Sequence, residues 1–144
     1  MEQDLYSEIE KENINYINTR LENTRGAIIH YRYITAIIVD DEQIKAQTSE
    51  NTVLMQELGH YYAGSYYRTT SPYSLIEKME HKADVASWKK FIPYQKVREL
   101  LSKGFSNMAD LADYFGVEAP YMARCIYFYS ENSNHFNNKT LTLI

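Results

Sequence analysis

The segment that decides the fold is Leu54-Met55-Gln56-Glu57-Leu58-Gly59-His60. It follows Thr48-Ser49-Glu50, where a hydroxyl group and an early acid are typical of a helix start. Downstream, Gly64 can take the left-handed conformation that ends many helices. The sequence therefore predicts a helix over residues 49–62, on which Gln56 and His60 lie one turn apart on the same face.

Two side chains at this spacing can bind one metal ion, and a glutamate beside the first of them can take a proton from metal-bound water. In the usual pattern, His-Glu-x-x-His, the first ligand is a histidine. Here Glu57 stands at the position of the general base and His60 at that of the second ligand, but the first position holds Gln56. A Glu-x-x-His pair alone is common, so the flanking sequence has to show whether this segment is a metal-binding motif.

The flanking residues carry a recognisable order. His60 is followed by two aromatic residues and a small one, and a second helical stretch holds Glu80-His81-Lys82-Ala83-Asp84 before Phe91-Ile92-Pro93. Over roughly residues 25–129 the chain resembles the ImmA/IrrE family of metallopeptidases, whose downstream element reads Glu-x-x-Ala-Asp/Asn. The resemblance implies an α+β fold of the minimal zincin-like type, one zinc ion, and cleavage of a protein, often the helix-turn-helix repressor of a phage or other mobile element.

The resemblance also implies a role for each motif residue. Glu57 would be the general base, His60 a zinc ligand and Glu80 the third ligand. Asp84 lies one turn beyond Glu80 on the same helix face. It would therefore either orient a ligand without contacting the metal or act as an alternative ligand.

Gln56 is the departure from the family pattern. Its neutral amide oxygen is a weaker zinc ligand than an imidazole nitrogen. Three outcomes are open: Gln56 binds zinc through its oxygen, Asp84 completes a site with His60 and Glu80, or no metal binds and the pocket is a relic. Two functions follow, a zinc-dependent endopeptidase or, as the alternative, a peptidase-like module that binds a repressor or other regulator without cutting it.

The rest of the chain predicts a small sheet packed on the motif helix and a mostly helical C-terminal half. Apolar residues at three- and four-residue spacings predict helices, and a run of β-branched and aromatic residues predicts strands. The predicted elements are a helix over 4–22, strands over about 27–45, the motif helix over 49–62, the third-ligand helix over 75–91 and a helical end over 94–129. Residues 1–129 are expected to form one domain, with a tail over 130–144.

Two surfaces are candidates for binding a protein partner. The chain has 14 tyrosines, and those near the motif could line a peptide groove: Tyr61 and Tyr62, together with Tyr66 and Tyr67. The strand expected over 34–39 could bind substrate backbone as an added strand.

Charge argues against nucleic acid as the partner. The net charge is −4, whereas nucleic-acid-binding surfaces are normally basic. Residues 107–129 have the outline of a helix-turn-helix unit, but Arg124 is the one basic residue on its second helix. We therefore expect this helix pair to be a packing element.

The compartment is inferred from cysteine usage and from the absence of targeting signals. Cys125 is the only cysteine, so no internal disulfide can form, and a buried structural thiol in a reducing cytoplasm is expected. The acidic start Met1-Glu2-Gln3-Asp4 does not resemble a signal peptide. No apolar run approaches the ~20 residues of a membrane span, so no membrane association is expected.

Overall fold

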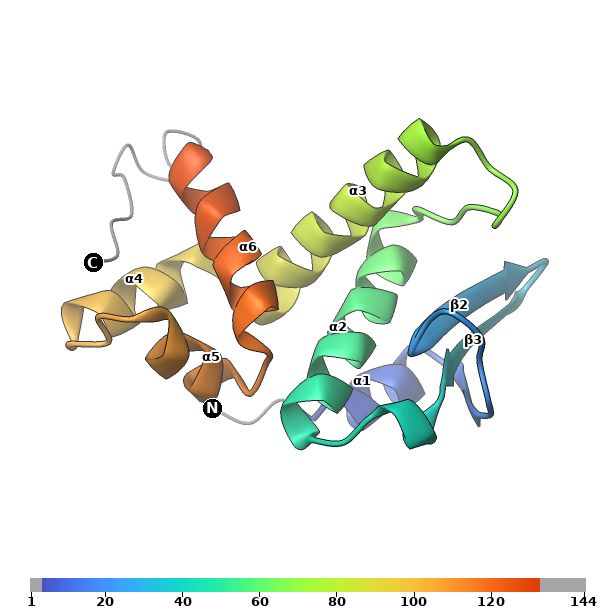
Figure 1. The fold of residues 1–144 in the computed structure, drawn as a ribbon, viewed down its shortest axis with the longest axis horizontal. Coiled ribbons are helices and arrows are strands. Elements are labelled where there is room, and N and C mark those ends of the chain that lie inside the picture. Colours follow the sequence, from blue (N-terminus) through green and yellow to red (C-terminus); the bar gives the residue numbers. More distant parts are fainter. Residues whose placement is uncertain (1–3, 133–144) are drawn as a thin grey trace.

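The computed structural model describes residues 4–132, in which a three-stranded sheet and the N-terminal helix lie on one side of a long central helix, and the helices that follow it in the sequence lie on the other (Figure 1). This arrangement confirms the predicted α+β class. The elements are α1 (Leu5–Lys11), β1 (Asn15–Asn18), β2 (Gly26–Tyr31), β3 (Ile34–Val39), the 3-10 turn Asp41–Gln43, α2 (Gln47–Ala63), α3 (Tyr73–Phe91), α4 (Tyr94–Ser102), α5 (Met108–Phe115) and α6 (Ala119–Glu131).

The prediction of one helix over 4–22 is wrong. Asp4 caps α1, which ends at Lys11, and Asn13 then takes a left-handed conformation with φ 56°. The chain continues as β1, which pairs in parallel with β3, Asn15 opposite Ala36. This pairing joins residues about twenty positions apart, so the local apolar spacing could not reveal it.

The sheet has the order β1-β3-β2, with β2 and β3 forming an antiparallel hairpin. Since β3 is the central strand, the prediction that residues 34–39 could accept an added strand is wrong. The edge strands are β1 and β2 instead. The strands also end at Val39, short of the predicted limit near 45, because Asp40 caps the 3-10 turn that follows.

The helices α2 and α3 begin two residues earlier than the predicted ranges 49–62 and 75–91. They cross with backbones in close contact at Gly59. A Cβ added to Gly59 would overlap the carbonyl oxygen of Ala83 and lie 2.9 Å from its carbonyl carbon and 3.0 Å from Cβ of Ser87. Only a glycine therefore allows this approach, which brings the C-terminal part of α2 beside the middle of α3.

Replacing Gly59 by alanine is expected to lower the free energy of unfolding by about 2 kcal/mol, because the cost of overpacking exceeds the ~1 kcal/mol that alanine adds to helix propensity. Denaturant unfolding measures the change. Lys82→Ala, at an exposed position of α3, is the control and should stay within about 0.5 kcal/mol of the wild type. Wild-type stability of Gly59→Ala would mean that the helices are not in this close contact.

The helical end packs against the far side of α2 and α3. Cys125 is fully buried and free, as predicted, and its neighbours on α6, Tyr121, Met122 and Tyr129, are buried with it. The hydroxyl of Tyr129 donates to the carbonyl of Ile92 at 2.7 Å and so ties α6 to the end of α3. No helix within residues 4–132 is long and apolar enough to cross a membrane. Most of the predicted tail, residues 133–144, lies outside the described residues.

Candidate active site

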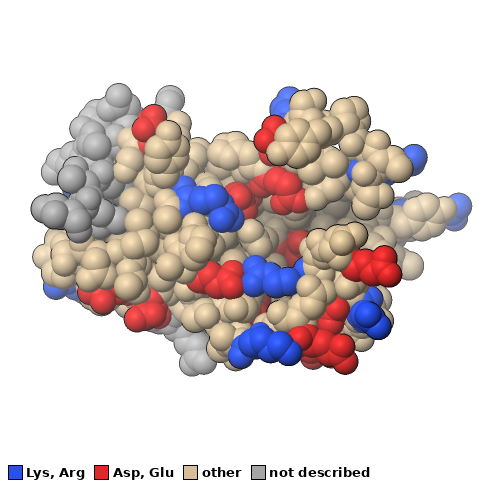
Figure 2. Space-filling view, in the orientation of Figure 1, with Lys and Arg blue, Asp and Glu red and all other residues tan. Residues whose placement is uncertain are grey.

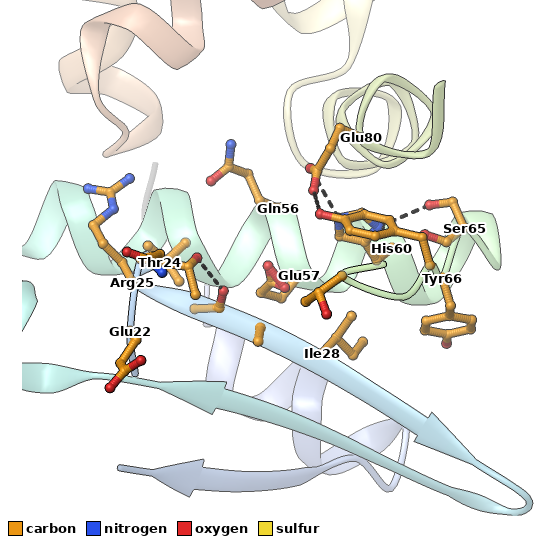
Figure 3. A pocket seen from close by; sticks show the side chains of 16 residues that line it. Glu22, Thr24, Arg25, Ile28, Gln56, Glu57, His60, Ser65, Tyr66 and Glu80 are labelled. Carbon is orange, nitrogen blue, oxygen red and sulfur yellow. Dashed lines mark hydrogen bonds and ion pairs between the residues drawn. The ribbon is translucent and has the colours of Figure 1, made fainter. Parts of the chain in front are cut away.

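A pocket of about 440 Å³ lies between α2, the start of β2, the loop after α2 and the facing side of α3. Figure 3 shows it from close by, with Glu57 and His60 on α2 and Glu80 above them on α3. All three predicted residues, together with Gln56, line this pocket. The close crossing at Gly59 therefore brings Glu57 and His60 of α2 together with Glu80 of α3.

His60 is buried and held at both ring nitrogens. Its Nδ1 lies 2.8 Å from the carbonyl oxygen of Ser65, and its Nε2 lies 3.2 Å from Oε2 of Glu80. A carbonyl oxygen can only accept, so Nδ1 carries a proton and Nε2 faces the carboxylate. Burial lowers the pKa of His60, but the hydrogen bond to Glu80 and the charge of Glu57 outweigh it and the pKa is raised.

Glu80 is the complementary partner in this pair. Its hydrogen bond with His60 holds its pKa below the usual range, against the opposing effect of burial, and a hydrogen bond from the Tyr67 hydroxyl acts in the same direction. Both carboxylate oxygens are thus engaged, one by His60 and the other by Tyr67. The carboxylate is ionised and held in one orientation.

Glu57 lies between α2 and β2 on the floor of the pocket (Figure 3). Burial raises its pKa to about 7, with the charge of Glu80 adding to the increase and that of His60 opposing it. A carboxyl group with such a pKa can exchange a proton near neutral pH, which suits a general acid or base.

Gln56 and Asp84 stand apart from the His60–Glu80 pair. Figure 3 shows the Gln56 side chain directed away from His60, although it still lines the pocket. Asp84 does not line the pocket, and its carboxylate instead lies 3.6 Å from the guanidinium of Arg124 on α6. Burial raises the pKa of Asp84, and the charge of Arg124 partly offsets this.

Two side chains of the pocket, His60 and Glu80, are placed as ligands of one zinc ion would be. Two ligand atoms of a tetrahedral zinc, each bound at about 2.0–2.2 Å, are separated by about 3.3–3.5 Å, close to the 3.2 Å between Nε2 of His60 and Oε2 of Glu80. Within residues 4–132, no three His, Cys, Asp or Glu side chains are grouped so that they could hold a metal ion. The remaining candidate for a protein ligand in the pocket is the neutral amide oxygen of Gln56.

The four tyrosines predicted to line a groove divide into two pairs. Tyr66 and Tyr67 line the pocket. The hydroxyls of Tyr61 and Tyr62 point to α1, where they donate to Glu12 and Glu8 respectively. The tyrosines next to the motif therefore anchor α1 to α2, and those in the following loop face the pocket.

An ion pair at the pocket rim was not foreseen from the sequence. Arg25, just before β2, makes two hydrogen bonds to the carboxylate of Glu118, at 2.8 and 3.0 Å, and Ser49 donates to the same carboxylate at 2.9 Å. In Figure 2 acidic and basic side chains lie next to one another across the middle of this face. The contact joins residues 93 positions apart, so no local sequence pattern could predict it.

The comparison with protein families agrees with this geometry. Residues 9–124 match the model of a peptidase family described as the IrrE N-terminal-like domain. The chain belongs to this family. No curated protein and no solved structure gives a significant match.

Membership in the IrrE N-terminal-like family confirms the resemblance drawn from the motif and its flanks. The family is one of metallopeptidases, which supports a hydrolase acting on a protein. Within the matched region the structure groups Glu57, His60 and Glu80, the residues to which a metallopeptidase would give the roles of base and ligands.

Proposed function

We propose that this protein is a zinc-dependent endopeptidase that cuts a regulatory protein in the cytoplasm, a helix-turn-helix repressor of a phage or other mobile element. The observation that carries the proposal is the convergence of Glu57 with the His60–Glu80 pair in one pocket beside the free edge of β2. A site of this kind, with an open strand edge next to a base and a ligand pair, suits an extended peptide substrate.

In this proposal His60 and Glu80 hold the metal, and the Gln56 side chain would rotate from the direction seen in Figure 3 to bring its oxygen to the metal as a weak third ligand. Zinc bound there would supply a Lewis acid that polarises the peptide carbonyl and makes water more acidic. The hydrogen bond from His60 Nδ1 to Ser65 keeps Nε2 directed at the metal position.

The chain's own residues then handle the proton and the substrate backbone. Glu57 takes a proton from the attacking water and passes it to the nitrogen of the leaving amine as the peptide bond breaks. The free backbone groups of β2 hold the substrate as an additional strand, so that the scissile bond lies above Glu57.

Gln56 supports a second candidate function. With a neutral amide in place of one strong ligand, zinc occupancy is lower at a given zinc concentration. The protein would then bind its regulator in the same pocket and leave it intact.

The zinc content and the fate of the partner separate these functions. Protein purified without chelators or nickel columns is expected to carry about one zinc per chain, and to cut a purified repressor from the same mobile element. Chelation should stop the cleavage and added zinc should restore it. A stable complex with intact repressor, unchanged by chelator, would instead establish the binding module.

A further inference from the structure

The loop that follows α2 contacts both members of the His60–Glu80 pair. Gly64 ends the helix in the left-handed conformation, with φ 62°, and turns the chain back toward α3. The next residue, Ser65, is buried and its carbonyl oxygen accepts the hydrogen bond from His60 Nδ1. Two residues on, the hydroxyl of Tyr67 donates to Oε1 of Glu80.

Tyr67 is placed to control the direction of the Glu80 carboxylate. Its ring lies edge-on to the His60 ring, with the centroids 5.9 Å apart, so its own orientation is restricted. It occupies one carboxylate oxygen of Glu80 and leaves the other to face His60 Nε2. The Glu80 side chain is 44 % exposed, and without this contact only the interaction with His60 would hold it against rotation toward solvent.

We propose that Tyr67 is a positioning residue of the metal centre, which holds Glu80 in the orientation required to share a metal ion with His60. The inference rests on the proposed function, because that function supplies the metal. Partners that orient metal ligands from outside typically contribute 10–100-fold in metal affinity. Tyr67→Phe keeps the ring and removes only the hydroxyl, so it tests this hydrogen bond directly.

Tyr66 provides the matched control. It precedes Tyr67, lines the same pocket and packs its ring against His30 at 4.8 Å. Tyr66→Phe removes the same atom from the same loop at a position whose ring packs on His30.

The experiment measures zinc affinity by competition with a chromophoric chelator, and records the visible spectrum of the cobalt(II)-loaded proteins. Each variant is made in the natural chain and in a Gln56→His background, where a stronger ligand replaces the amide. Tyr67→Phe is expected to weaken zinc binding about 10–100-fold and to change the cobalt bands. Tyr66→Phe should keep the zinc affinity within about threefold of its parent and leave the cobalt bands unchanged.

Each outcome decides the question. Unchanged affinity and cobalt bands for Tyr67→Phe in a background that binds metal would overturn the inference and leave the proposed function standing. A Tyr67 effect seen only with Gln56→His, together with no zinc in the natural chain, would support the inference and contradict the zinc-dependent function. Equal losses in Tyr67→Phe and Tyr66→Phe would mean general loosening of the loop and would also overturn it. Metal binding in neither background would overturn both.

Discussion

Glu57→Gln is expected to slow cleavage of the protein substrate by about 10³-fold, within the range that a general base contributes. Glutamine has nearly the same shape but cannot accept the proton from water or return it to the leaving amine. Zinc content should remain as in the wild type, because His60 and Glu80 are untouched. Initial rates of repressor cleavage, with metal analysis of the same samples, measure both expectations.

The same substitution should not unfold the protein. Burial already disfavours the charged form of Glu57, so a neutral amide of equal size is tolerated or stabilising. Glu77→Gln, at an exposed position on α3, is the control and should cleave at the wild-type rate. Cleavage by Glu57→Gln at more than about a tenth of the wild-type rate would remove Glu57 from the role of base.

Gln56→His is expected to raise zinc affinity by about 100-fold, or about 2.8 kcal/mol. An imidazole nitrogen replaces an amide oxygen at the position one turn before His60, and three strong protein ligands are the usual number in a catalytic zinc site. Competition with a chromophoric chelator measures the change. An increase below about threefold would mean that a side chain at position 56 cannot reach the metal held by His60 and Glu80.

Gln56→Ala distinguishes the two roles that the natural residue can have. If the Gln56 oxygen binds zinc, its removal lowers the affinity by about tenfold or more. If zinc is held by His60 and Glu80 without it, the affinity stays the same. The comparison of the histidine, glutamine and alanine proteins therefore shows how much of the metal site this chain retains.

The sequence was most informative where the signal is local. The spacing of Glu57 and His60 on one helix, the second helix with Glu80, and the buried position of Cys125 all depend on residues within a few turns of one another. Each of these elements is found in the structure near its predicted limits. Helical periodicity is a local property, so it can be recognised in the sequence without knowledge of the rest of the fold.

The N-terminal region shows the opposite case. Residues 4–22 have apolar residues at helical spacings, yet the second half becomes β1 because β3 offers it a parallel partner. The same non-local pairing makes β3 the central strand and leaves β1 and β2 at the edges of the sheet. Strand pairing partners are distant in sequence, and a single sequence carries little information about which strand lies at the edge.

The sequence by itself determined the family, the α+β class and the candidate residues of the site, because these depend on side-chain types at fixed local spacings. Only the tertiary structure decided how those residues meet. The backbone contact at Gly59 sets the distance between α2 and α3, and the loop through Ser65 and Tyr67 sets the direction of His60 and Glu80. Close packing and hydrogen bonds between distant segments form only when the chain has folded, so no local sequence pattern predicts their geometry.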